Sequence, residues 1–121
     1  MSEPTTVILY VENVAASCVF YSELLAKAPV ESSPNFAMYA LASGVMLGLW
    51  ARHDAQPSPK AAGGGGELAI VAKDDVELEA KHEEWKGRGW SIAQKPARMD
   101  FGYTFTALDP DGHRVRVMAL A

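Results

Sequence analysis

The pattern of apolar and polar positions divides the chain into two similar series of elements. In the first series, residues 6–13 form an apolar, β-branched run typical of a buried strand, and residues 14–27 place apolar side chains at helical spacing. Three short extended runs follow at residues 29–33, 35–41 and 45–51, separated by residues that favour turns. The first series therefore predicts the order strand, helix, strand, strand, strand.

A second series with the same order follows residues 53–66, a stretch with two prolines and four consecutive glycines that predicts a flexible connection. Residues 67–74 predict a strand and residues 75–89 a helix, with acidic residues early and basic residues late, as the helix dipole favours. Further extended runs are residues 90–99, 102–108 and 113–120. Asn13 and either Asp74 or Asp75 are expected to cap the two helices.

The two series align with one another, which indicates an internal duplication. Thr6 aligns with Glu67, Phe36 with Tyr103 and Gly44 with Gly112. We predict an α+β fold of two βαβββ repeats, at about 5–52 and 67–121, joined by the linker 53–66 within a single domain 1–121. Each repeat has one helix for four strands, so one face of its sheet must meet another repeat, another chain or a ligand.

Composition narrows the classes of partner. The chain has 121 residues, 11 Lys and Arg against 15 Asp and Glu, and a formal charge of -4, which argues against nucleic acid. No apolar run approaches the roughly 20 residues of a membrane-spanning helix, so no membrane partner is expected. Cys18 is the only cysteine and no secretory signal is evident, and these features predict a cytoplasmic protein without an internal disulfide.

Two stretches together resemble a known superfamily. "VILYVENVAASCVFYSELL", a strand, Asn cap and helix in the first repeat, and "LDPDGHRVRV", before the last strand of the second repeat, are similar to signatures of the vicinal oxygen chelate superfamily. This superfamily includes glyoxalase I, extradiol dioxygenases and bleomycin resistance proteins. The resemblance covers essentially the whole chain. It implies a glyoxalase-like fold in which the two repeats form a curved mixed sheet around a cleft.

Enzymes of that superfamily usually hold a divalent metal with four side chains from the first and last strand of each repeat. The resemblance places Thr6, Gly48, Glu67 and Arg116 at those positions. Only Glu67 is a good ligand, because Gly48 has no side chain and Arg116 is a permanent cation. We therefore predict no metal and no cofactor, with Arg116 paired to Glu67 instead.

The run "VMLGLW" suggests a different use for the same face. Met46, Gly48 and Trp50 share one side of their strand, and Gly48 is expected to leave a void beside the Trp50 indole. A planar aromatic ligand would stack on the indole, and the polarizable Met46 would adapt to its outline. Ile8 and Tyr10 are expected to lie beside Thr6 on the cavity side of the first strand.

Within the superfamily, the chain looks most like the phenazine antibiotic resistance proteins, which sequester the drug between two protomers without metal or chemistry. This resemblance implies a homodimer that binds a planar aromatic small molecule. The expected ligand-binding residues, with Trp50 as the stacking residue, are Trp50, Gly48, Met46, Phe36, Met38, Tyr103, Phe105, Arg116 and Glu67.

Two other functions stay open at this point. One is a metal-dependent lyase or dioxygenase built around Glu67 with His53 or His113, and the other is a regulatory or structural module whose cavity is filled. Both main features also have simpler interpretations. Trp50 would then fill a core or a dimer seam, and Glu67 and Arg116 would form a structural ion pair.

Overall fold

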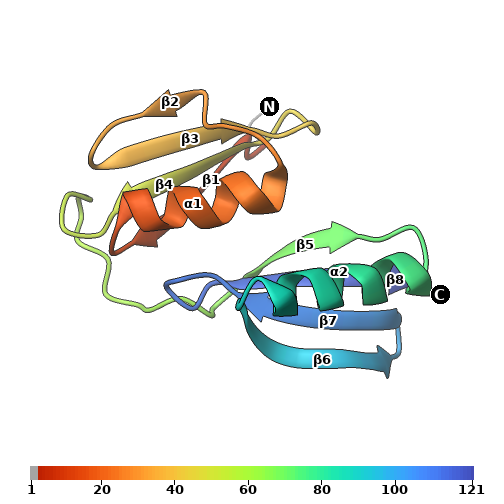
Figure 1. Cartoon of the computed structure of the whole chain (residues 1–121). Coiled ribbons are helices and arrows are strands. Elements are labelled where there is room, and N and C mark those ends of the chain that lie inside the picture. Colours follow the sequence, from red (N-terminus) through yellow and green to blue (C-terminus); the bar gives the residue numbers. More distant parts are fainter. Residues whose placement is uncertain (1–2) are drawn as a thin grey trace. The chain divides into compact units, whose positions relative to one another are not determined.

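The computed structural model describes residues 3–121, and its chain divides between Ala61 and Ala62 into two compact units (Figure 1). Each unit consists of four strands and one helix in the order βαβββ. We call the part before this boundary unit 1 and the part after it unit 2. The predicted α+β fold with two βαβββ repeats is confirmed, and the boundary between the units lies within the proline- and glycine-rich stretch.

Unit 1 is built around the central strand β4. Its elements are β1 (Thr6–Val11), α1 (Val14–Leu25), β2 (Glu31–Ser32), β3 (Phe36–Ala40) and β4 (Met46–Ala51). The strand order is β1-β4-β3-β2, with β1 parallel to β4 and the other neighbours antiparallel. The parallel pairing requires a crossover, and α1 together with β2 and β3 provides the connection from β1 to β4.

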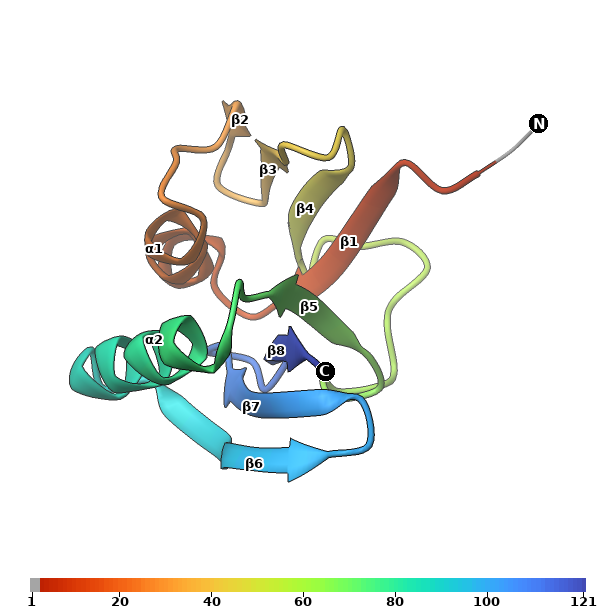
Figure 2. The ribbon, with the colours of Figure 1, turned by 90° about the vertical axis from the view of Figure 1, so that its right-hand side faces the viewer.

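Unit 2 repeats this topology. Its elements are β5 (Glu67–Val71), α2 (Asp75–Gly87), β6 (Ser91–Met99), β7 (Gly102–Leu108) and β8 (Arg114–Leu120). The strand order is β5-β8-β7-β6, so β5 and β6 are the edge strands in Figure 2. The turn between β7 and β8 is stabilised by Asp109, whose carboxylate accepts hydrogen bonds from the backbone N–H groups of Asp111 and His113, both at 2.8 Å.

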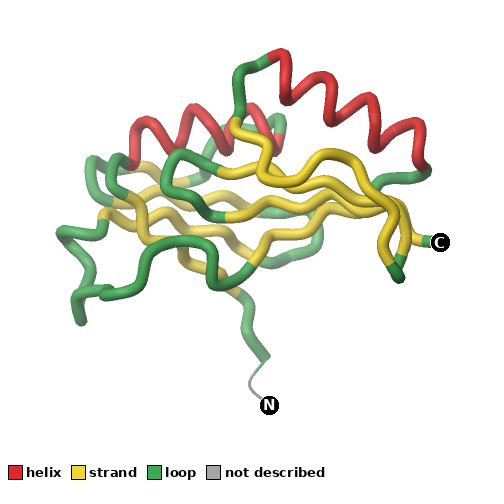
Figure 3. Tube along the Cα trace, turned by 90° about the horizontal axis from the view of Figure 1, so that it is seen from below, coloured by secondary structure: helices red, strands yellow, loops and turns green. Residues whose placement is uncertain are grey.

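The helix of each unit lies on one side of its own sheet (Figure 3). In unit 1 this side contains the fully buried Tyr21, Tyr39 and Leu49, and in unit 2 it contains Leu78 and Phe105. Burying a large apolar side chain contributes about 1.5–3 kcal/mol, so these side chains favour the packing of each helix on its own sheet. The opposite side of each sheet is not covered by a helix of the same unit.

The helix starts are capped by the expected residues. The Asn13 side chain accepts a hydrogen bond from the Ala16 backbone N–H at 3.0 Å, and Asp74 does the same for Glu77 at 2.9 Å. Each cap satisfies an N–H group that has no partner within its helix. Neither α1 nor α2 is long and apolar enough to cross a membrane.

Candidate functional site

The open face of unit 1, the sheet side away from α1, carries rows of aromatic and methionine side chains. Strand register aligns Tyr10 with Trp50 and Trp50 with Phe36, so these three rings form one row across β1, β4 and β3. The next row on the same face joins Ile8, Gly48 and Met38, and the row after it joins Thr6, Met46 and Ala40. The sequence-predicted residues of unit 1 therefore lie together on one face.

Trp50 occupies the centre of the aromatic row. Its ring centroid is 6.2 Å from that of Tyr10 at an interplanar angle of 45°, and 6.4 Å from that of Phe36 at 86°. The indole Nε1 donates a hydrogen bond to the Asp54 carboxylate at 3.0 Å. These contacts fix the orientation of an indole that remains partly exposed.

The expected void over Gly48 is not open. A Cβ atom built at Gly48 would lie 3.2 Å from Cζ and 3.3 Å from Cε1 of Phe36, and 3.4 Å from Cγ1 of Ile8. The Phe36 ring therefore covers the space that the absent side chain leaves. The prediction of a void was wrong because a residue on β3, two positions from Met38, extends its ring over the glycine.

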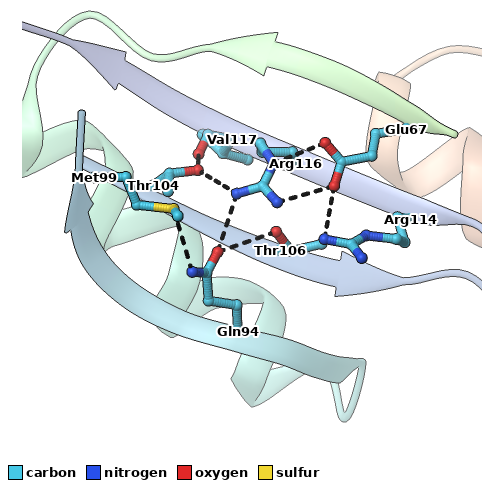
Figure 4. A network of polar contacts seen from close by, with 8 residues as sticks. All are labelled: Glu67, Gln94, Met99, Thr104, Thr106, Arg114, Arg116 and Val117. Carbon is cyan, nitrogen blue, oxygen red and sulfur yellow. Dashed lines mark hydrogen bonds and ion pairs between the residues drawn. The ribbon is translucent and has the colours of Figure 1, made fainter. Parts of the chain in front are cut away.

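The open face of unit 2, the sheet side away from α2, carries a polar network centred on Arg116 (Figure 4). Arg116 Nε donates to Glu67 Oε1 at 2.8 Å and Nη2 donates to Glu67 Oε2 at 2.9 Å, a bidentate pair. Arg116 Nη1 also donates to Gln94 Oε1 at 3.0 Å and Thr104 Oγ1 at 3.1 Å. The predicted pairing of Arg116 with Glu67 is confirmed.

A second guanidinium approaches the same carboxylate. Arg114 Nη2 lies 2.8 Å from Glu67 Oε2, and the Glu67 side chain is 30% exposed while that of Arg116 is 13% exposed. Hydrogen bonding to Arg116, and then the charges of Arg116 and Arg114, hold the pKa of Glu67 below its ordinary value despite partial burial. Glu67 is therefore a carboxylate at neutral pH with both oxygens engaged.

Gln94 and Arg114 are network members that were not among the expected site residues. For Arg114 the sequence does predict the shared face with Arg116, because the two residues are two positions apart on one strand. No comparable signal existed for Gln94, since an irregularity in β6 between Ile92 and Gln94 sets its side. The Gln94 side chain meets Arg116 only because of this irregularity.

Two expected ligand-binding residues lie on the other side of the unit 2 sheet. Phe105 is fully buried, and its ring centroid is 5.2 Å from that of Trp85 on α2. The Tyr103 hydroxyl donates to Glu79 of the same helix at 2.8 Å, which raises the pKa of Tyr103. Their expected placement with Arg116 was wrong, because β7 pairs Phe105 with Val117 and thus with the helix side.

Comparison with known proteins places the chain in a superfamily. Residues 4–117 match the Glyoxalase/Bleomycin resistance protein/Dioxygenase superfamily. The chain belongs to this superfamily. The sequence prediction based on two signature stretches is thus confirmed over almost the full length of the chain.

Individual relatives span the chain from end to end. It is 26% identical to the phenazine antibiotic resistance protein EhpR of Enterobacter agglomerans, over 97% of this chain and 92% of that protein. A protein of Agrobacterium tumefaciens, solved in solution by NMR, is 49% identical with a TM-score of 0.88, covering 100% and 99% of the two chains. A glyoxalase-related enzyme of Fulvimarina pelagi has a TM-score of 0.85 at 22% identity, covering 98% and 88%, and supports the shared fold.

The glyoxalase superfamily resemblance also implies four metal-ligand positions, and the residues there do not suit a divalent ion. Thr6 and Gly48 offer at most a hydroxyl oxygen, and Arg116 supplies a positive charge. The remaining carboxylate, Glu67, directs both oxygens to guanidinium groups. Within residues 3–121 no group of three or more His, Cys, Asp and Glu side chains is placed to hold a metal ion.

Proposed function

We propose that this protein binds a planar aromatic small molecule, without metal and without chemical conversion, on the open face of unit 1. The observation that carries the proposal is the row Tyr10, Trp50 and Phe36, which lies partly exposed on a sheet face that its own helix does not cover. Exposed apolar patches of this kind mark binding surfaces in soluble proteins. The name of EhpR, a phenazine antibiotic resistance protein, supports a planar drug as ligand.

The chemistry of this face suits a flat, apolar ring system. Trp50 provides the largest surface for stacking, worth about 0.5–1.5 kcal/mol beyond the burial of apolar area. Met38 lies in the row next to the aromatic row and Met46 in the row after it, and their flexible thioethers adapt to ligands of different outline. Phe36 must rotate from its place over Gly48 if the ligand is to reach the strand backbone there.

Glu67 and Arg116 have a different part in the proposal. Their hydrogen bonds go to each other and to Gln94 and Thr104, and the short bidentate geometry holds them rigid. We assign them a structural part, the shaping of the polar open face of unit 2. Tyr103 and Phe105 are left out of the proposed site because they contact α2.

We also propose that the protein acts as a cytoplasmic homodimer. Each unit leaves one sheet face uncovered by its own helix, and such faces are normally buried against another sheet, a second chain or a ligand. Light scattering coupled to size exclusion should give a mass near twice the 13.0 kDa of the chain. A monomeric mass at all concentrations would contradict this part of the proposal.

The binding proposal is tested by titrating the protein with phenazine and following tryptophan fluorescence. Saturable quenching is expected, and a chelator should not change it. Calorimetry, which does not depend on tryptophan fluorescence, should show that Trp50→Ala no longer binds phenazine. Trp90→Phe is the control, because Trp90 packs on Trp85 and Arg88 in unit 2 and should leave ligand affinity unchanged.

Three results would refute the proposal. The first is a lack of binding across a panel of planar aromatic compounds, and the second is equal affinity in the wild type and Trp50→Ala. The third is a stoichiometric transition metal in the purified protein with turnover that depends on it, which would favour a lyase or dioxygenase.

A further inference from the structure

Unit 2 contains a groove on the helix side of its sheet, away from the polar network. It lies between α2 and β6, has a volume of about 300 Å³ and is lined by His82, Lys86, Ile92 and Lys95. This volume is at the lower end of the range for small-molecule sites. None of the four residues belongs to the proposed aromatic site.

The irregular strand β6 creates this groove. Ile92 pairs with Ala107 and Gln94 with Thr106, so two steps along β6 correspond to one step along β7. The extra residue moves Gln94 to the open face, where it meets Arg116. The strand is irregular again between Gln94 and Ala97, the segment that contains Lys95, and both Ile92 and Lys95 line the groove.

The groove combines an apolar interior with two cations. The His82 side chain is only 12% exposed and its ring packs edge-on against Phe105 at 5.3 Å between centroids. Together with Ile92 it provides a mainly apolar lining. Lys86 and Lys95 are both exposed residues at this groove.

The two lysines are not neutralised by neighbouring acids. Among residues 3–121, neither ammonium group has an ion-pair or hydrogen-bond partner. Glu79 accepts a hydrogen bond from Tyr103, and Glu84 pairs with Arg88 at 3.6 Å. The exposed Glu83 places its Oε1 3.7 Å from Nδ1 of the groove residue His82, so the rim of the groove carries one carboxylate and two ammonium groups without partners in the described part of the chain.

We propose that the groove between α2 and β6 is a second binding site, which takes a small carboxylate with an apolar tail. The tail lies against Ile92 and the His82 ring, and the carboxylate lies between the ammonium groups of Lys86 and Lys95. The apolar contact provides affinity, and the two cations select an anion over a neutral compound of the same shape. This site is independent of the aromatic ligand proposed for unit 1.

The test is a titration of the labelled protein with octanoate, followed by NMR of the backbone amides and the Ile92 methyl group. Saturable shifts are expected at Ile92, His82 and Lys95. Octanamide, which is neutral and has the same number of heavy atoms, should bind at least fivefold more weakly. Binding of octanoate should also weaken as salt is raised, because the two lysines are exposed.

Variants separate the lysine pair from general charge effects. The double variant Lys86→Gln/Lys95→Gln should bind octanoate about tenfold more weakly. Each lysine is exposed and contributes at most a few-fold to the affinity, and the two contributions multiply. Lys73→Gln/Lys81→Gln is the control, since it removes the same charge at residues that do not line the groove. Amide spectra of all variants should overlay with the wild type away from the substituted positions, which shows that they are folded.

The proposal is overturned if octanoate causes no saturable shifts at the groove, if octanamide binds equally well, or if the two double variants have the same affinity. Trp50→Ala should leave octanoate binding at the groove unchanged. This variant distinguishes the two sites, because it abolishes phenazine binding if the proposed function holds.

Discussion

The substitution Glu67→Gln tests whether the polar network stabilises unit 2. It keeps the size of the side chain but removes the negative charge that lies between Arg114 and Arg116. One of the two carboxylate oxygens becomes an amide that donates hydrogen bonds, so it no longer accepts from a guanidinium. Arg116, with a side chain only 13% exposed, then retains its charge without a full partner.

The expected cost is about 2 kcal/mol of the free energy of unfolding. Removing one partner of a fully buried ion pair costs about 3–5 kcal/mol, and hydrogen bonds to charged groups contribute about 1.5–3 kcal/mol each. The Glu67 side chain is 30% exposed and Arg114 is 40% exposed, so water compensates part of the loss. Glu84→Gln, at an exposed pair on α2, should change stability by less than about 0.5 kcal/mol.

Stability is measured by urea unfolding in a Trp50→Phe background. This background leaves Trp85 and Trp90, both in unit 2, as the fluorescent reporters. The measurement therefore reports the unfolding of the unit that contains the network, even if the two units unfold separately.

The pH dependence gives an independent check on the same variant. The folded-state pKa of Glu67 is lowered by its guanidinium partners, so its contribution is present above the ordinary carboxyl pKa of 4.5. The contribution is lost as the pH falls through the lower folded-state value. The difference in the free energy of unfolding between wild type and Glu67→Gln should therefore be largest near neutral pH and should disappear at acid pH. Equal stability of Glu67→Gln and Glu84→Gln, or a difference that does not change with pH, would refute the reasoning.

Two further predictions concern the backbone and the core. Gly102→Ala should destabilise unit 2 by at least about 2 kcal/mol in urea unfolding, because φ at Gly102 is 139° and a Cβ atom would collide with the backbone oxygen of Ala119. The control is Gly65→Ala, which should not change stability because no atom lies near its Cβ position. Tyr39→Phe should cost about 1 kcal/mol, since the hydroxyl bonds Ser22 at 2.9 Å. Burial raises the pKa of Tyr39 to about 12, so ultraviolet titration curves of the folded wild type and of Tyr39→Phe should coincide below pH 11.

The sequence predicted the elements well because each has a strong local signal. The helix caps Asn13 and Asp74, the glycine-rich connection and the alternation in β8 are all features of a few adjacent residues. The pairing of Glu67 with Arg116, although 49 residues apart, was also predicted, because the superfamily resemblance placed both residues at corresponding metal-ligand positions.

The errors in the candidate site concern which face a side chain occupies. For Phe105 the information was present: the turn pairs Leu108 with Arg114, which fixes Phe105 opposite Val117 and therefore on the side away from Arg116. For Gly48 it was absent, because only the packed sheet shows that the Phe36 ring covers it.

The sequence by itself determined the order of elements, the duplication and the alternation that gives β8 an apolar side and a side with two arginines. These properties depend on neighbouring residues and on the fixed periods of helix and strand. The tertiary structure alone decided that Gln94 meets Arg116 and that Lys95 lines a groove beside α2. The reason is that β6 is irregular between Ile92 and Gln94 and again between Gln94 and Ala97, which breaks the alternation of faces.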